Sequence, residues 1–328
     1  MDFNPFSPWH LLARAASAAL HRVVEQSPTR SPSDSTPVPR TRARVATVDG
    51  LKVFYREAGE VDSPVIVLLH GFPSSSHMYR DLIPLLADRF RVIAPDYIGF
   101  GHSDAPTVEQ YTYTFDKLAA TTQHLLDQIG VTSAVYYMQD YGGPIGMRLA
   151  INHPDRVRGL VFQNANAYME GVSQAAIDVF MPLWQQGDET GARQMLLAQT
   201  TRYQYVAGAR NPDALNPDAW THDQALLDRP GSAERQIALF KDYQTNVASY
   251  DAWHAYFREH QPKTLLTWGR GDPFFTVPGA EAFKRDLTNL EVHYFDTGHF
   301  ALEEDALPIA ALIKRKFSRA SDQRLAAA

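Results

Sequence analysis

The sequence predicts an α/β fold, in which a mostly parallel, doubly wound sheet carries an inserted helical cap. Short apolar runs without polar alternation recur along the chain, as in strands that are buried on both faces. Helix-like stretches lie between several of these runs, which is the pattern of βαβ units. No strand signal occurs between about residues 164 and 262, although helix-like segments do, so this stretch predicts the cap.

The expected elements begin with a β-hairpin near residue 45. Alternating apolar residues flank Asp49-Gly50, a dipeptide that suits the two-residue turn of a hairpin. The buried strands that follow are expected at Val65–Leu69, Val92–Ala94, Ala134–Met138, Leu160–Phe162, Thr264–Trp268 and Val292–Phe295. Core helices are expected at Met78–Asp88, Thr114–Ile129, Ile145–His153 and Ala280–Leu287, and cap helices at Ala175–Gln186 and Ser232–Tyr243.

These elements divide the chain into four regions. They are an N-terminal arm with a Pro/Ser-rich linker at 1–44, an α/β core at 45–163 and 263–317, a helical cap at 164–262 and a C-terminal tail at 318–328. The arm has helical periodicity, but Asp2 and Arg14 make it a poor secretory signal. We therefore expect a packing arm and a cytoplasmic protein.

Composition excludes several classes of function. The 328 residues are 45% hydrophobic and 21% charged, as in globular domains with a large core. There is no cysteine, which removes disulfides, thiolate metal sites and a cysteine nucleophile. The net charge of −6 argues against nucleic acid as a partner. The apolar runs are far shorter than the ~18 residues of a membrane span, so none is expected.

Four short motifs follow expected strands, where a doubly wound sheet places its ligands. They are HGFP at 70–73, MQDYGGP at 138–144, WGRGD at 268–272 and TGHF at 297–300. The second motif stands between a strand and a helix. The candidate catalytic residues in these motifs are Asp140, Asp272 and His299. Alone, Asp140 also suits a helix N-cap and Asp272 a turn.

From about residue 45 to 317 the chain resembles the α/β-hydrolase superfamily. The order nucleophile, acid, histidine is that of the family, and its strand–turn–helix elbow carries Asp140. The resemblance implies a triad of Asp140, Asp272 and His299. It also implies an oxyanion hole made by the backbone N–H groups of Phe72 and Tyr141.

The nucleophile position determines the expected chemistry. No G-x-S-x-G motif occurs, and the elbow carries an aspartate instead of a serine. An aspartate is ionised at neutral pH, so it attacks a saturated carbon without a base and forms an alkyl ester. His299 then activates water against that ester. Water is the second substrate, and no metal or organic cofactor is expected.

Within the superfamily, aspartate elbows belong chiefly to epoxide hydrolases, haloalkane dehalogenases and haloacetate dehalogenases. The elbow MQD, the segment DYIGFGHSD at 96–104 and GHF at 298–300 resemble haloalkane dehalogenases. Those enzymes, however, place a tryptophan donor where this chain has Tyr141. Trp184 in the cap is a candidate donor for the leaving group. The segment DYQTN at 242–246 resembles the epoxide-hydrolase segment with a ring-opening tyrosine, here Tyr243.

The favoured prediction is an epoxide-hydrolase-like enzyme that acts on small hydrophobic substrates, with a haloalkane dehalogenase as the alternative. Tyr203 or Tyr205 is a candidate for the missing second cap tyrosine. A haloacetate dehalogenase ranks third, because Arg80 and Arg91 do not fit its carboxylate site. A non-catalytic small-ligand receptor on the same fold is the alternative of another class. The acidic residues 303–305 are expected to form a solvated helix turn.

Overall fold

The computed structural model describes residues 40–318. The expectations for the N-terminal arm and for the last ten residues lie outside this range. The described residues belong to one compact unit that begins at Pro39. No helix in this part of the chain is both long and apolar enough to cross a membrane.

The centre of the fold is an eight-stranded sheet in the order β1-β2-β4-β3-β5-β6-β7-β8. The first two strands form the expected hairpin, and β2 also pairs antiparallel with β4. In the rest of the sheet, from β4 through β3, β5, β6 and β7 to β8, every pair of neighbouring strands is parallel. The strands are β1 (Arg42–Val48), β2 (Leu51–Ala58), β3 (Val65–Leu69), β4 (Arg91–Pro95), β5 (Ala134–Gln139), β6 (Val157–Gln163), β7 (Thr264–Gly269) and β8 (Leu290–Phe295).

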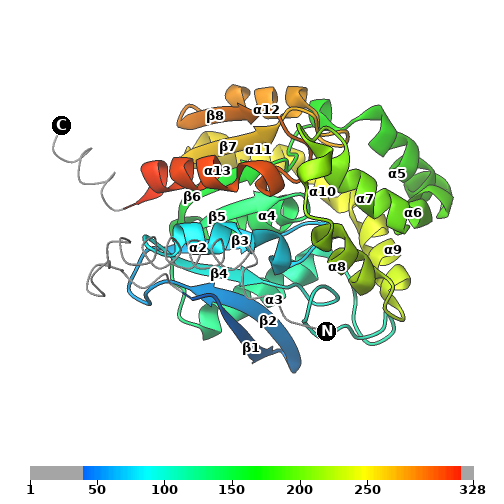
Figure 1. Ribbon diagram of the computed structural model, residues 1–328, viewed down its shortest axis with the longest axis horizontal. Helices are drawn as coiled ribbons and strands as arrows, with labels where there is room; N and C mark the ends of the chain where they lie inside the picture. Colours follow the sequence, from blue (N-terminus) through cyan, green and yellow to red (C-terminus); the bar gives the residue numbers. More distant parts are fainter. Residues whose placement is uncertain (1–39, 319–328) are drawn as a thin grey trace, which may run out of the picture. The chain divides into compact units, whose positions relative to one another are not determined.

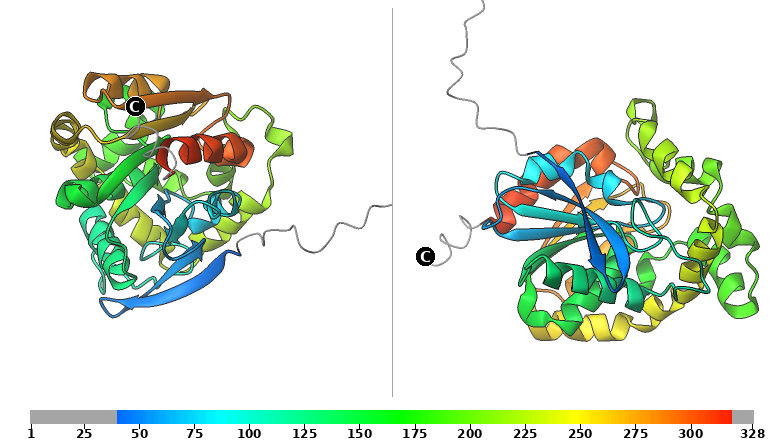
Figure 2. Two further views of the ribbon diagram at one scale, coloured as in Figure 1. Left: turned by 90° about the vertical axis from the view of Figure 1, so that its left-hand side faces the viewer. Right: turned by 90° about the horizontal axis from the view of Figure 1, so that it is seen from below.

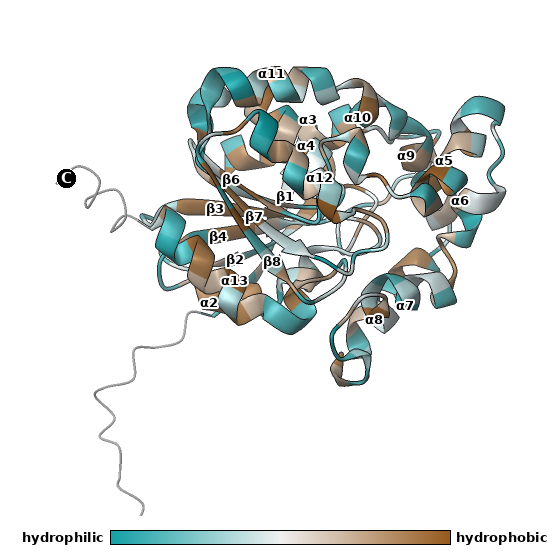
Figure 3. Ribbon diagram, turned by 90° about the horizontal axis from the view of Figure 1, so that it is seen from above, coloured by the Kyte–Doolittle hydropathy of each residue, from teal (hydrophilic) through white to brown (hydrophobic). Residues whose placement is uncertain are grey.

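Helices cover both faces of this sheet, as Figures 1 and 3 show. On one face lie α3 (Phe115–Gln128), α4 (Gly142–Asn152) and α11 (Tyr250–His260), and on the other α2 (Leu82–Leu86) and α13 (Leu302–Phe317). The strands read as continuous apolar runs because both faces are buried; β5 and β7 are buried at every residue. The predicted α/β-hydrolase fold class is confirmed.

Three helices differ clearly from their expected bounds, and proline explains the first two. The helix expected at Met78–Asp88 is a 3-10 turn at Ser76–Tyr79 followed by α2. Pro84 lies in the first turn of α2, and its ring would clash with a carbonyl of a continuous helix. In contrast, α4 starts three residues earlier than expected, at Gly142, because Pro144 is accommodated in a first helical turn. In place of the helix expected at Ala280–Leu287, the structure has a helix at Val277–Ala282 and a 3-10 turn at Phe283–Arg285.

The chain between β6 and β7 is helical. The helices α5 (Gln174–Gln186), α6 (Thr190–Gln194), α7 (Ala198–Val206), α8 (Asp218–Leu227), α9 (Ser232–Asp242) and α10 (Gln244–Ala248) lie beside one end of the sheet (Figures 1 and 2). We call them the cap helices. The next helix, α11, lies on the sheet beside α4 instead, and its Phe257 ring contacts Phe162 of β6. The boundary at 262 stays a prediction.

Short connecting elements complete the fold. The helix α12 (Val277–Ala282) follows Thr276, close to the bridge that Val172 forms with Phe275. The remaining 3-10 turns are at Pro154–Arg156, Met169–Gly171, Pro212–Ala214 and Phe283–Arg285. The start of the cap segment is thereby tied to the loop after β7, where Asp272 lies.

Candidate active site

The turn between β5 and α4 presents Asp140. Its backbone φ is +49°, in the left-handed region that non-glycine residues rarely adopt. Gly142 allows the sharp turn, because a Cβ there would lie 2.0 Å from the carbonyl oxygen of Leu69. Gly143 allows α4 to pack close to Ala165. The local sequence thus forms a strained strand–turn–helix elbow with a carboxylate at its tip.

Backbone donors hold the carboxylate of Asp140. The N–H of Phe72 donates to Oδ1 at 2.7 Å. The backbone N–H of Tyr141 also bonds to the carboxylate. Burial raises the pKa of Asp140, although His299 and these two N–H groups act in the opposite direction. The two residues expected to form an oxyanion hole therefore already converge on this side chain.

His299 and Asp272 form a buried pair. Nδ1 of His299 lies 2.7 Å from Oδ2 of Asp272. Oδ1 of Asp272 accepts from the backbone N–H groups of Phe274 (2.7 Å) and Phe275 (3.1 Å). Burial opposes the charge on His299, but the carboxylates of Asp272 and Asp140 outweigh it and raise its pKa. This arrangement makes His299 a stronger base than an ordinary buried histidine.

Asn164 positions Asp272 and was not found from the sequence. It follows β6 and has a φ of +44°. Its Nδ2 donates to Oδ2 of Asp272 (2.9 Å) and to the carbonyl of Gly269 (3.1 Å), and its Oδ1 accepts from the Gly269 N–H (2.8 Å). The only signal in the sequence is a polar residue at the end of an apolar strand.

Gln139 is a second residue that the sequence analysis missed. It is fully buried, and its Nε2 donates to Nε2 of His299 at 2.8 Å. With the Nδ1 proton of His299 directed to Asp272, Nε2 is the ring's acceptor. The amide thus favours the tautomer of His299 in which Nε2 carries the lone pair. This lone pair is the basic site of the neutral ring.

A cavity of about 80 Å³ lies in front of Asp140 and His299, with room for several water-sized groups. Core residues near 72, 141, 275 and 299 form one part of its wall, and residues between 169 and 247 form the other. Most of the wall is aromatic or aliphatic, including Phe72, Ile177, Phe180, Met181, Phe240 and Val247. The structure therefore brings the predicted nucleophile and histidine to one apolar cavity.

Two tyrosines reach this cavity. Tyr243 and Tyr141 both line it, and their ring centroids are 5.9 Å apart. Burial raises both pKa values well above 10, and the charge of Asp140 adds to this effect. Both hydroxyls are therefore protonated. Tyr243 bonds to the hydroxyl of Tyr250. The hydroxyl of Tyr141 is buried and has no partner among the described residues.

Three other expected donors are differently placed. Trp184 lines the cavity, but its indole N–H donates to the carbonyl of Phe240 (2.8 Å). In this geometry the N–H is not free for a leaving group, and the expected role of Trp184 stays a prediction. Tyr203 is 50% exposed. Tyr205 donates its hydroxyl to Asp223 (2.5 Å). Neither tyrosine is among the residues that line the cavity, so neither replaces a second cap tyrosine.

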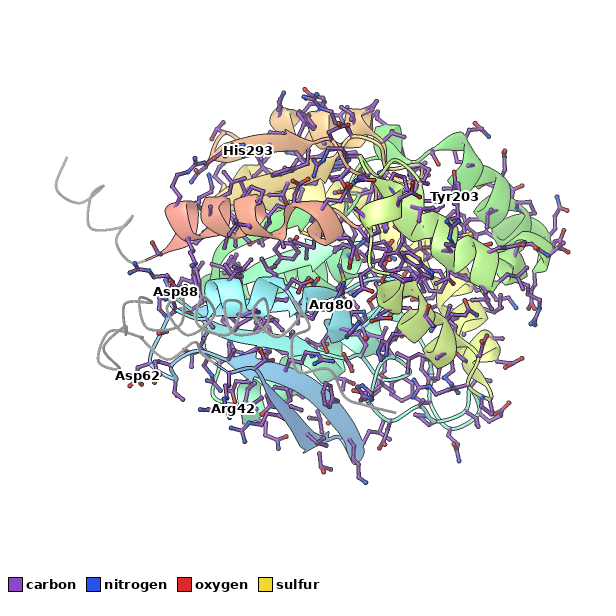
Figure 4. All side chains as sticks on the ribbon, in the orientation of Figure 1. Arg42, Asp62, Arg80, Asp88, Tyr203 and His293 are labelled. Atoms are coloured by element: carbon purple, nitrogen blue, oxygen red, sulfur yellow. The ribbon has the colours of Figure 1, made fainter. Side chains whose placement is uncertain are left out.

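The expected solvated turn at 303–305 is also wrong. Glu303 forms a bidentate pair with Arg80 at 3.0 and 2.6 Å, and Figure 4 labels this arginine. Glu304 accepts from the backbone N–H of Arg210, and Asp305 pairs with its guanidinium. Glu304 and Asp305 fasten the loop after α7 to α13, and Glu303 fastens the end of the 3-10 turn at Ser76–Tyr79 to the same helix. Their partners are distant in sequence, so periodicity alone did not reveal them.

The described residues contain no cluster of three or more histidine and acidic side chains placed to hold a metal ion.

His70, which follows β3, is stacked on Tyr97 with ring centroids 4.1 Å apart. Burial lowers the pKa of His70 to about 4. It is a neutral packing residue at neutral pH.

The fold and this site are those of an α/β hydrolase, and comparisons with known proteins agree. The family profile described as alpha/beta hydrolase fold matches residues 64–306, so the chain belongs to this family of enzymes. An uncharacterized hydrolase of Saccharomyces cerevisiae is 41% identical over 281 residues, which cover 84% of this chain and 96% of the relative.

A haloalkane dehalogenase of Mycobacterium marinum is 32% identical over 228 residues, which cover 68% of this chain and 73% of the relative. The crystal structure of the epoxide hydrolase CorEH superposes with a TM-score of 0.69 at 19% identity, covering 85% of this chain and 99% of that one. At 19% identity, the similarity to the epoxide hydrolase CorEH concerns the fold alone. Both substrate classes thus occur among proteins that resemble this chain.

Proposed function

We propose that this hydrolase opens epoxides through a covalent ester on Asp140, which water activated by His299 then cleaves. The observation that carries the proposal is the placement of one carboxylate. Asp140 stands at a strained elbow, its Oδ1 accepts the Phe72 N–H at 2.7 Å, and it lines the same cavity as His299. Asp272 and Asn164 orient that histidine.

In the first step, Oδ2 of Asp140 attacks an epoxide carbon, and the carbon–oxygen bond of the ring breaks. The charge on Asp140 passes to the departing oxygen, which takes a proton from a phenol. Tyr243 is the proposed donor, because it is neutral and lines the cavity. Tyr141 is the proposed second donor to the same oxygen, because it lines the cavity and its hydroxyl has no partner among the described residues. General acid catalysis of this kind contributes about 10²- to 10⁴-fold.

In the second step, His299 takes a proton from water, and the resulting hydroxide attacks the ester carbonyl. The carbonyl oxygen is Oδ1 of Asp140, which the Phe72 N–H already holds. The same N–H groups therefore meet the negative charge as it develops on that oxygen. Asp272 stabilises the imidazolium. Collapse of the tetrahedral intermediate breaks the bond between Cγ and Oδ2, and the departing alkoxide takes the proton back from His299. The carboxylic acid that remains returns its proton to the Tyr243 phenolate, so the diol leaves and both the carboxylate and the phenol are restored.

Donor chemistry favours an epoxide over a haloalkane. A halide leaves without a proton but needs N–H or O–H groups that remain free to solvate it. Trp184, the expected cap donor, is engaged with a backbone carbonyl. An alkoxide needs a proton, which neutral phenols supply. The second candidate is a haloalkane dehalogenase, which the 32% identity to the Mycobacterium marinum enzyme favours.

The test is a paired screen of styrene oxide and 1-bromohexane, followed by diol and bromide release. We expect diol from the epoxide and little bromide. Bromide release alone would replace the proposal with the dehalogenase. If neither probe turns over and both only bind, the non-catalytic receptor becomes the better explanation. A variant with Asp140→Asn is the control for background hydrolysis.

A further inference from the structure

The cavity wall contains one polar side chain for which the proposed reaction has no use. Gln204 of α7 lines the cavity and is 2% exposed. Its Nε2 is buried and has no hydrogen-bond partner among the described residues. Buried amide groups are almost always paired, and leaving one unpaired is costly. An unpaired donor in a ligand cavity is therefore a candidate contact for the ligand.

The rest of α7 shows that this unpaired amide is not the result of a poorly packed helix. Two of its neighbours are paired: Thr201 donates to Gln224 (2.6 Å) and Tyr205 to Asp223 (2.5 Å). Tyr203, labelled in Figure 4, is half exposed. The helix thus satisfies its other buried polar groups. Gln204 is the residue that it presents to the cavity.

Gln204 and the two tyrosines line the cavity from separate elements. Gln204 belongs to α7, Tyr141 to the turn before α4, and Tyr243 to the junction of α9 and α10. A substrate that fills the cavity can therefore contact the amide and the phenols together.

The charges around the cavity define the chemistry of the missing partner. No lysine or arginine is among the described residues that line it, and the proposed reaction requires Asp140 as a carboxylate. A carboxylate or phosphate there would be repelled and left without a counter-charge. An uncharged oxygen acceptor has no such penalty. An amide N–H recognises such an oxygen directly.

We propose that Gln204 anchors the substrate by donating a hydrogen bond to an uncharged acceptor oxygen that lies outside the reacting epoxide. The substrate class is then a neutral, mostly apolar epoxide with an ether, carbonyl or similar oxygen in its chain. This inference rests on the proposed function for the reacting group. It goes beyond it by naming a second polar feature of the substrate and the residue that recognises it.

The test compares two isosteric epoxides, benzyl glycidyl ether and 1,2-epoxy-5-phenylpentane, which differ in one ether oxygen. We expect wild-type kcat/KM to favour the ether by about five- to tenfold, the usual value of one such hydrogen bond. Gln204→Met should remove this preference by slowing the ether only. Gln199→Met, at an exposed glutamine of the same helix, should leave both substrates unchanged. An equal loss on both epoxides in Gln204→Met, or no loss, would overturn the assignment.

A binding experiment separates this inference from the proposed reaction. Benzyl ethyl ether and butylbenzene are unreactive isosteres, and Trp184 in the cavity wall reports their binding by fluorescence. We expect tighter binding of the ether to the wild type and equal binding of both to Gln204→Met. If no epoxide is hydrolysed but this difference in binding persists, the proposed epoxide hydrolysis is refuted and the proposed hydrogen bond from Gln204 is supported. If wild type binds both equally, the anchor is refuted even where epoxides turn over.

Discussion

Two buried carboxylates of this hydrolase have tyrosine neighbours, yet their surroundings differ. Asp140 faces a cavity whose tyrosines direct their hydroxyls elsewhere or to no partner. Asp223 of α8 is fully buried and accepts the hydroxyl of Tyr205 at 2.5 Å. The hydroxyl of Ser74, in the loop after β3, lies 3.4 Å from its other oxygen. We call Asp223, Tyr205 and Ser74 the cap junction.

The difference separates reactive from structural polar groups. In the cap junction, donors and acceptors are matched within the protein, so the cluster holds α7 and α8 to the core. In the cavity, the hydroxyl of Tyr141 and Nε2 of Gln204 have no partner among the described residues, so both are available to a ligand. Identical residue types therefore serve stability in one place and chemistry in the other. Variants of each cluster should affect different measurements.

The largest expected effect is on turnover by the Asp140 variant. Asp140→Asn replaces the nucleophile by a neutral amide and should lower epoxide turnover by at least about 10⁴-fold. Asp223→Asn, the matched change in the cap junction, should leave kcat within a few-fold. Steady-state kinetics on freshly prepared protein, checked by mass for deamidation, measures both. Similar losses of turnover in the two variants would contradict the distinction between a reactive Asp140 and a structural Asp223.

The next effect distinguishes the tyrosines. Tyr243→Phe should slow epoxide opening by about 10²-fold, because it removes the proposed proton donor. Bromide displacement from a bromoalkane should change little. Tyr205→Phe should instead lower the free energy of unfolding by about 1–3 kcal/mol, since it leaves Asp223 short of a donor. Single-turnover kinetics measures the rate of epoxide opening, and urea unfolding measures the free energy of unfolding. A Tyr243 variant that is slow on both substrates would indicate a role in cavity shape.

A smaller effect is expected at Gln139. Its amide donates to Nε2 of His299, which stabilises the neutral ring. Gln139→Met removes this bond, so the pKa of His299 should rise and the acidic limb of the ester-hydrolysis rate should move to higher pH. At neutral pH the rate should fall by roughly tenfold. If the pH profile keeps its midpoint and the rate is lower by the same factor at every pH, Gln139 affects only the packing around His299 and not its pKa.

The last effect is on the pH dependence of stability and not on turnover. Burial raises the pKa of Asp223 from 3.8 to about 7. Between these values the folded protein holds a proton that the unfolded chain has lost, so wild-type stability falls as pH rises from about 4 to 7. The loss is up to roughly 4 kcal/mol. Urea unfolding should show that Asp223→Asn removes this slope. Parallel curves for the two proteins would show that Asp223 titrates normally.

The sequence was sufficient for the fold, because each buried strand is a local apolar run and Asp140-Tyr141-Gly142-Gly143 is a local elbow. It also placed the three candidate catalytic residues at strand ends. It was insufficient for Gln139, Asn164 and Gln204, whose roles come from side-chain contacts across the sheet or from the cap. Glu303 was misread for the same reason, since its partner Arg80 is 223 residues away.

The most direct test of the account is one turnover of styrene oxide in ¹⁸O-water, with mass spectrometry of the diol and of the peptide that contains Asp140. If Asp140 is the nucleophile, its own oxygen leaves with the product and water attacks the ester carbonyl. We predict an unlabelled diol and one ¹⁸O atom in Asp140. A labelled first-turnover diol with an unlabelled peptide would mean that water attacks the epoxide directly, and would contradict the covalent mechanism.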